Sequence, residues 1–261
     1  MVTLLGASRR GDGRPRRPPD HAARSACRCP RCPCQSVPGK KALMKSTPTI
    51  DNTFARKVCI NLDRRPDRWE AMQRKFAEQN ILTVERLPAV DARLVSVPES
   101  LSHMRPQDYG CTMSHLAAVQ QAKAAGASEV LIFEDDAFFA ADFAARFPDF
   151  IAQVPDDWHM LFLGAYHFAP PIPVAPNVVK TVETLTAHAY VVRNSLYDAF
   201  IAINEHPPAI NDRNNLVLQK TFNCYCFEPN LVGQESGYSD IMDEVMPEKP
   251  LTYSMPIPDG W

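Results

Sequence analysis

EVLIFEDD, residues 129–136, places a short apolar run directly before three consecutive acids. A run of this length that is rich in Val, Ile and Phe is typical of a buried strand. Three carboxylates crowded at a strand end repel one another, and a divalent cation would remove that penalty. Carboxylates suit Mg²⁺ or Mn²⁺, which also accept diphosphate oxygens. The stretch therefore predicts metal ligands at a strand end; the alternative is a solvated acidic turn, or a helix cap formed by Asp136.

The segments on either side of this strand alternate between strand and helix patterns. Residues 57–62 (KVCINL) are typical of a buried strand, and apolar residues then recur at helical spacing over 66–79. Further strands are predicted at 83–87, 159–163, 185–192 and 225–227, and further helices at 111–125, 142–153 and 194–204. The alternation predicts an α/β fold with a mostly parallel sheet flanked by helices. Because ligands bind beyond the carboxyl ends of parallel strands, residues 61–68 and 134–136 are expected on one rim.

The chain is predicted to be a single domain, residues 56–245, between a disordered N-terminal tail, residues 1–50, and a C-terminal extension, residues 246–261. The tail is rich in Pro, Arg, Gly and Ser and has no hydrophobic period. Its CRCPRCPC cluster offers thiolates that suit zinc, although the spacing is a weak match to zinc motifs. A second interpretation is that translation starts at Met44. The four cysteines of the body are interpreted as small buried hydrophobic residues.

The charge is unevenly distributed along the chain. Residues 1–41 hold eight arginines and two lysines against two aspartates, a formal charge of +8, so the rest carries −10 of the net −2. An acidic body argues against a nucleic-acid partner. No long apolar run and no secretory-signal pattern occur, so we expect a cytoplasmic location. A weak contact of the basic tail with the inner face of a membrane is an alternative that the sequence leaves open.

Two polar clusters accompany the acidic stretch, residues 134–136. Arg64, Arg65 and Arg68 follow the first strand, where planar guanidinium groups suit a phosphate or a base; a solvated basic turn is the alternative. Ser114 and His115 are expected in the first turn of a helix, where backbone amides meet anions. For His115, the alternative is a satisfied core histidine.

Six segments, in this order along the chain, resemble glycosyltransferase family 25, which includes bacterial lipopolysaccharide-modifying galactosyltransferases and the collagen galactosyltransferase domain. They are 58–69 (VCINLDRRPDRW), 86–93 (RLPAVDAR), 110–116 (GCTMSHL), 130–138 (VLIFEDDAF), 157–165 (DWHMLFLGA), and 229–235 (PNLVGQE) with 239–241 (SDI). Ala92 stands where the family usually has glycine, and His159 where an acid is common. The resemblance spans residues 57–241.

The resemblance implies a GT-A-like (Rossmann-like) fold and transfer of a hexose, commonly galactose from a UDP-sugar donor, with inversion, to a hydroxyl of a glycan or glycolipid acceptor. Carried over by position, Glu134 and Asp136 would contact Mn²⁺ or Mg²⁺ and the diphosphate. The donor site would be bordered by Asn61, Arg65, Arg68, Ser114, His115 and Asp135, with Asp135 toward the ribose or sugar.

The catalytic base is the least defined part of this assignment. The family usually has an aspartate in the segment that here reads AIND, residues 209–212, where Asn211 takes that slot and Asp212 follows. An amide cannot accept the acceptor's proton, so Asp212 and Asp240 are the two candidates.

Three other functions compete with this assignment. The departures at Asn211 and Ala92 favour a degenerate family member that binds nucleotide sugar or a partner without turnover. A metal-dependent hydrolase is less compatible, since the seven histidines do not cluster along the sequence. A zinc-binding adaptor would act through the cysteine-rich tail.

Overall fold

The computed structural model describes residues 46–242, 244–246 and 251, which belong to a unit beginning at Ser46. The cysteine cluster, the start at Met44 and most of the C-terminal extension lie outside the described residues. Regular structure begins earlier than the predicted domain start at residue 56, because residues 50–53 form a helix. Helix α1 (Ile50–Thr53) is capped by the Thr49 side chain, and Ile50 is buried. In the described ranges, no helix is both long and apolar enough to cross a bilayer.

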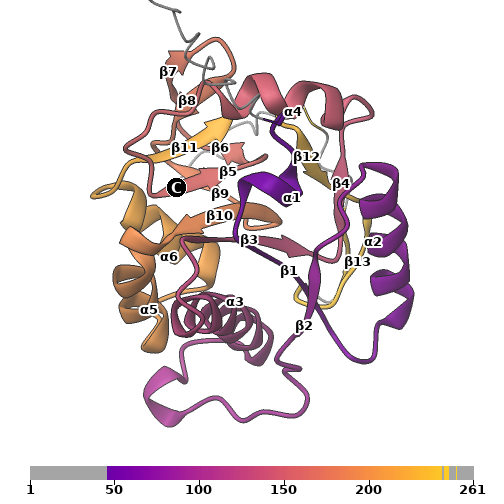
Figure 1. Cartoon of the computed structure of the whole chain (residues 1–261). Coiled ribbons are helices and arrows are strands. Elements are labelled where there is room, and N and C mark those ends of the chain that lie inside the picture. The colour runs from indigo at the N-terminus through magenta and orange to yellow at the C-terminus, as the bar shows by residue number, and fades with distance from the viewer. Residues whose placement is uncertain (1–45, 243, 247–250, 252–261) are drawn as a thin grey trace, which may run out of the picture. The chain divides into compact units, whose positions relative to one another are not determined.

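Eight strands form the central sheet (Figure 1). Their bounds are β1 Arg56–Asn61, β2 Glu85–Pro88, β3 Glu129–Glu134, β5 Met160–Phe162, β7 Ile172–Ala175, β8 Val178–Lys180, β10 Ala189–Arg193 and β11 Cys224–Phe227. Their order across the sheet is β2-β1-β3-β10-β5-β11-β8-β7. Only β10 and β8 run against their neighbours, and the other six strands share one direction. The prediction of a mostly parallel sheet is therefore confirmed.

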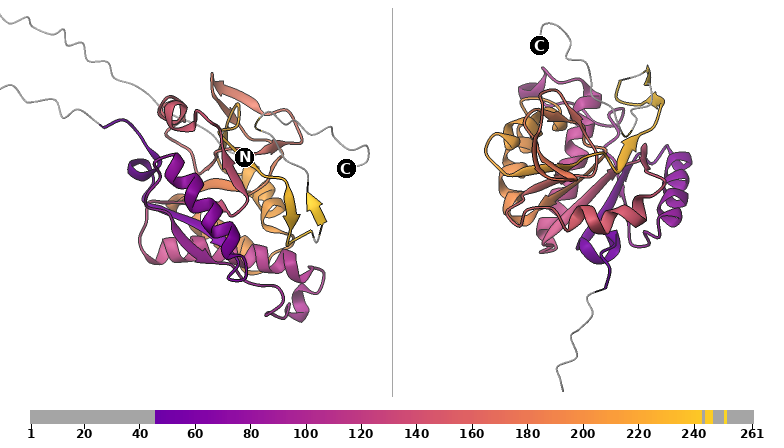
Figure 2. Two further views of the ribbon diagram at one scale, coloured as in Figure 1. Left: turned by 90° about the vertical axis from the view of Figure 1, so that its right-hand side faces the viewer. Right: turned by 90° about the horizontal axis from the view of Figure 1, so that it is seen from above.

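Smaller elements surround the sheet. They are the strands β4 Ala137–Phe139, β6 Tyr166–His167, β9 Thr184–Leu185, β12 Val232–Gln234, β13 Gly237–Ser239 and β14 Glu244–Met246, and the short 3₁₀ helices Glu99–Leu101 and Asn194–Leu196. Strand β4 pairs with β12, β6 with β9, and β13 with β14, all antiparallel. Both views of Figure 2 show the yellow β13–β14 hairpin at the periphery of the unit, apart from the central sheet.

Helices cover both faces of the sheet. Their bounds are α2 Pro66–Glu78, α3 Pro106–Ala124, α4 Phe143–Ile151, α5 Tyr197–Glu205 and α6 Asn211–Gln219. Helices α1, α2 and α4 pack on one face, and α3, α5 and α6 on the other (Figure 1; Figure 2, right). Because side chains alternate along a strand, β3 directs Leu131 and Phe133 into the first core and Val130 and Ile132 into the second. Burial on both faces explains why this strand is a continuous apolar run rather than an alternating one.

Two helices differ from the sequence prediction. Helix α3 begins at Pro106, five residues before the expected 111, because proline is well suited to the first helical position. Helix α6 was not predicted, because Asn211, Asn214, Asn215 and Gln219 hide its buried side behind polar residue types. Gln219 is buried by bonding both backbone groups of Thr184, accepting from its N–H at 3.1 Å and donating to its C=O at 2.7 Å.

Candidate functional site

The site is built on the carboxyl ends of β1 and β3. These strands are parallel with Ile60 opposite Glu134, so the residues that follow, Asn61 and Asp135, emerge side by side. Asn61 Nδ2 donates to Asp135 Oδ2 over 2.6 Å. The prediction that the two segments share one rim is confirmed.

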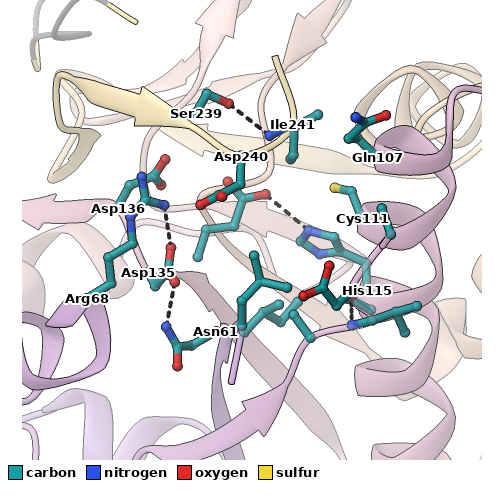
Figure 3. A pocket seen from close by; sticks show the side chains of 18 of the residues that line it. Asn61, Arg68, Gln107, Cys111, His115, Asp135, Asp136, Ser239, Asp240 and Ile241 are labelled. Carbon is teal, nitrogen blue, oxygen red and sulfur yellow. Dashed lines mark hydrogen bonds and ion pairs between the residues drawn. The ribbon is translucent and has the colours of Figure 1, made fainter. Parts of the chain in front are cut away.

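Two adjoining pockets open over these strand ends, and Figure 3 shows one of them. Glu134, Asp135, Asp136 and Arg68 line both pockets. The first is also lined by Asn61, Ser114, His115 and Asp240, and the second by Arg65 and Asp212. The fold therefore gathers all ten predicted site residues, although their roles stay predictions.

Asp136 carries the least satisfied charge of the acidic stretch. Its Oδ2 accepts from Gln234 Nε2 at 3.0 Å, whereas its Oδ1 is buried without a hydrogen-bond partner in the described part of the chain. Burial, together with the negative charges of Glu134 and Asp135, raises the pKa of Asp136 to about 7. A carboxylate of this kind is stabilised by a cation, because the cation neutralises the charge that burial penalises.

Asp135 is already held by protein groups. Besides the Asn61 amide, its Oδ1 accepts from Arg68 Nη1 at 2.9 Å. Burial raises the pKa of Asp135 even though Arg68 opposes the shift. Arg68 also donates to the Tyr238 carbonyl at 2.6 Å, so it connects α2, the acidic stretch and the β13–β14 hairpin.

Asp240 holds the arginine turn, residues 64–68, in place. One oxygen of Asp240 lies 2.6 Å from Arg64 Nη1, and the other lies 2.8 Å from Arg65 Nη1. Arg65 is held further by Asp67 at 2.8 Å. Both oxygens of Asp240 are thus engaged by guanidinium groups, an arrangement that suits positioning of the turn better than proton abstraction.

The expected position of Ser114 and His115 in a first turn is wrong. Because α3 begins at Pro106, both residues lie well inside the helix, and their amides are not at its open N-terminus. Ser114 Oγ instead donates to the Gly110 carbonyl at 2.7 Å and accepts from Val90 N at 2.8 Å. It fixes the loop after β2 against α3, and so shapes the pocket wall.

His115 is buried, as the core-histidine alternative requires, but one of its partners faces the pocket. Its Nδ1 lies 3.0 Å from the Tyr190 hydroxyl and its Nε2 lies 3.1 Å from Glu134 Oε1. Figure 3 shows Cys111 and His115 on the same helix beside the acidic residues. The thiol of Cys111, the ring nitrogens of His115 and the carboxylate of Glu134 place one ligand atom each within 4.8 Å of the others.

Cys111 departs from the prediction that all four cysteines of the body are buried. Cys59, Cys224 and Cys226 are buried, as predicted, whereas Cys111 lines both pockets. Burial of its sulfur, and then the charge of Glu134, raises the pKa of the Cys111 thiol well above its usual value. The spacing of four residues to His115, which puts both side chains on one helix face, is the sequence signal that could have identified it.

Two more pocket residues were not assigned from the sequence. Gln234, on β12, holds Asp136 and lies in the PNLVGQE segment, to which no individual role was given. Thr186, between β9 and β10, lines the second pocket with φ +83°, a strained conformation for a β-branched residue. The resemblance to the family marks the segment of Gln234 but not its contact with Asp136, and no sequence signal marks Thr186, because both positions depend on where distant loops meet.

The base candidates occupy different places. Asp212 is the second residue of α6 and faces the second pocket, while Asp240 lies in the first pocket between the arginines. Asn211, in the slot where the resemblance expects an aspartate, is fully buried, and its N–H donates to Thr112 Oγ1 at 3.1 Å.

Comparisons with known proteins found curated relatives, solved structures and a family model. Human inactive glycosyltransferase 25 family member 3 is 27% identical over 157 residues, which is 51% of this chain and 26% of that protein. Human procollagen galactosyltransferase 2 is 28% identical over 145 residues, which is 48% of this chain and 23% of that protein. The chain therefore spans about a quarter of the length of these curated relatives.

A solved glycosyltransferase involved in glycosylation of the major capsid of PBCV-1 aligns with a TM-score of 0.35 and 10% identity, over 59% of this chain and 67% of that one. The family model described as glycosyltransferase family 25 (LPS biosynthesis protein) matches residues 54–199. That match includes β1, the arginine turn, α3 and the acidic end of β3, and covers more than half of the sequence. The chain belongs to glycosyltransferase family 25.

Proposed function

We propose that this protein is a glycosyltransferase that moves a hexose, with galactose favoured, from a UDP-sugar to a hydroxyl of a glycan or glycolipid. The reaction is proposed to be metal-assisted and to invert the anomeric centre. Family membership supports the reaction class. The cytoplasmic location and the weak membrane contact stay predictions.

The proposal rests on the buried carboxylate of Asp136. A buried carboxylate oxygen without a protein partner in the described residues, next to two more acids, fits an oxygen-preferring divalent cation. Glu134 and Asp136 would hold Mn²⁺ or Mg²⁺, which when bound supplies a Lewis acid for the leaving diphosphate. The observed Gln234 bond to Asp136 fixes the orientation of that carboxylate.

The remaining residues bind and orient the donor. Arg68 faces both pockets and is the cationic group best placed to meet a donor phosphate once the nucleotide enters. Asp240 keeps Arg64 and Arg65 in place, and Asn61 with Arg68 sets the direction of Asp135. Rigid placement of this kind lowers the entropy cost of reaching the reactive geometry.

The second pocket is proposed to receive the acceptor. Asp212 lines it and is the proposed base: the acceptor hydroxyl loses its proton to the carboxylate while its oxygen attacks the anomeric carbon. The bond from that carbon to the diphosphate breaks, and UDP leaves with the electron pair.

The proposal is tested by incubating the purified chain with UDP-galactose and Mn²⁺. UDP release is expected without an acceptor, because water can replace the acceptor hydroxyl as the nucleophile. Removing metal with EDTA is expected to lower the rate by at least about a hundredfold, since the cation contributes several kcal/mol to the barrier. Added Mn²⁺ should restore it. Binding of donor without UDP release would instead support the degenerate alternative.

The two base candidates predict different kinetic changes. Asp212→Asn is expected to lower kcat by roughly 10²–10⁴-fold with little change in donor KM, because proton abstraction is lost. Asp240→Asn is expected mainly to raise donor KM, because Arg64 and Arg65 lose the ion pairs with Asp240 that hold them in place. Steady-state UDP release across donor concentrations separates the two. A collapse of kcat in Asp240→Asn with normal turnover in Asp212→Asn would reverse the roles.

A non-catalytic function is the second candidate. Asn211 in the expected aspartate slot favours it, and one matched human relative is named an inactive family member. In that case donor and Mn²⁺ would still raise the melting temperature, since any ligand that binds only the native state stabilises it. The rate of UDP release would then equal the rate in a protein-free mixture of donor and Mn²⁺.

A further inference from the structure

We propose that Cys111, His115 and Glu134 form a second cation site that selects a thiophilic ion such as Zn²⁺. Filling this site would withdraw Glu134 from the Mn²⁺ or Mg²⁺ site proposed above. Binding stands on the geometry of the three side chains, while the inhibition that follows rests on the proposed function.

The backbone already aligns the three ligands. Cys111 and His115 are four residues apart on α3, so they lie one turn apart on the same helix face. Glu134 ends β3 opposite that face, with its Oε1 3.1 Å from His115 Nε2. One ligand atom from each residue lies within 4.8 Å of the other two. Zinc bonds of about 2.0–2.3 Å place tetrahedral ligand atoms about 3.3–3.8 Å apart, so side-chain rotations complete the site.

The imidazole is oriented for this use. Tyr190 is buried, and its hydroxyl lies 3.0 Å from His115 Nδ1, the nitrogen that faces away from Glu134. A hydrogen bond at one ring nitrogen fixes the ring and directs the other nitrogen toward a metal. The His115 ring cannot turn away without losing this contact.

The types of ligand atom in this site discriminate between metal ions. A thiolate and an imidazole suit Zn²⁺, whereas the carboxylates of Glu134 and Asp136 suit Mg²⁺ or Mn²⁺. Three protein ligands leave a fourth position, and because Cys111, His115 and Glu134 all line the first pocket, that position is accessible to water or a ligand oxygen. Glu134 belongs to both sets, so the two ions compete for it.

Cobalt binding tests the site without relying on activity. Cys27, Cys29, Cys32 and Cys34 are first replaced with serine in the full chain, because the tail thiols would bind the same ions. Titrating this reduced protein with Co²⁺ is expected to give a thiolate-to-cobalt charge-transfer band that saturates at one equivalent. One equivalent of Zn²⁺ should remove the band.

Variants in the same background locate the ligands. Cys111→Ser is expected to lose the band, and His115→Ala to weaken Co²⁺ affinity at least about tenfold. Cys224→Ala, which changes a buried thiol of β11, should keep the band. Asp136→Asn should keep it as well, which separates this site from the proposed Mn²⁺ site.

Two results of the Co²⁺ titration would contradict the proposed site. No band in a protein whose circular dichroism shows it to be folded, or a band that survives Cys111→Ser, overturns the proposal. If Cys111→Ser does not fold, alkylation of Cys111 followed by mass spectrometry replaces it: one equivalent of Zn²⁺ should slow the labelling, and an unchanged rate overturns the site. Where UDP release is measurable, Zn²⁺ should inhibit the parent protein but not Cys111→Ser.

Discussion

Asp136→Asn is expected to lower Mn²⁺-dependent UDP release by roughly a thousandfold or more, and also to stabilise the metal-free protein above neutral pH. The first effect follows from losing a proposed metal ligand, and several kcal/mol of barrier lowering with it. The second follows from removing a buried charge that lies beside Glu134 and Asp135. A gain in stability with a loss of activity is typical of a residue kept for function.

This stabilisation depends on pH through the raised pKa of Asp136. The pKa of Asp136 is raised from 3.8 to about 7 in the folded protein. Between these values the folded state keeps a proton that the unfolded state has lost, so the free energy of unfolding falls as pH rises from about 4 to about 7. A shift of this size corresponds to at most about 4 kcal/mol. The asparagine variant should lack this decline, so its advantage over the parent grows with pH and levels off above about 7.

Chemical unfolding of the metal-free proteins at pH 5 and pH 8 measures the effect, and UDP release measures activity. Asp142→Asn is a matched control, because Asp142 is an exposed acid at the start of α4 that lines neither of the two pockets. It should change neither property appreciably. Retained turnover in Asp136→Asn would remove Asp136 from the metal site, and equal stability at both pH values would show that its charge is already compensated.

Gly164→Ala is expected to destabilise the fold by more than about 4 kcal/mol, a range that point mutations seldom reach. A Cβ at Gly164 would lie 1.8 Å from the Val232 carbonyl oxygen, and backbone atoms cannot swing aside as a side chain can. The close packing of Gly164 against Val232 also positions β12 at the site. Leu231 N donates to the Leu163 carbonyl at 2.9 Å, and the Gln234 side chain on β12 donates to Asp136 Oδ2. Displacing β12 should therefore disturb Asp136 as well as the core.

Gly126→Ala provides the comparison. Gly126 has φ +67° at the end of α3, but a Cβ there meets no atom within 4 Å. Only the left-handed backbone penalty of about 1–2 kcal/mol should appear. Denaturant unfolding of both variants gives the two values. Similar small losses would mean that β12 shifts easily, and that the placement of Gln234 is less rigid than the contact implies.

Much of the sheet could be predicted because its signals are local. The apolar run before Glu134 and the proline at the start of α2 each specify an element through neighbouring residues alone. The order of strands and helices then placed Asn61 and Asp135 on one rim, where the structure has them. Membership of the family could likewise be inferred from the ordered segments that the family model matches in part.

The remainder of the site depends on contacts between residues far apart in the chain. Asp240 reaches Arg65 across 175 residues, and Gln234 reaches Asp136 across 98. No periodicity encodes such pairs, since they exist only after β12 and the segment following β13 pack against the strand ends. Helix α6 was missed for a related reason, because its buried amides are satisfied by distant partners such as Thr184.

The sequence by itself determined the α/β layers, the family and the acidic strand end, because hydrophobic periodicity and residue order are properties of neighbouring residues. Only the tertiary structure decided that Ser114 acts as a brace, that Asp240 is held by two arginines, and that Cys111 joins His115 and Glu134. Burial and charge pairing are set by the whole fold, and these two quantities decide which polar residues are left to bind a ligand.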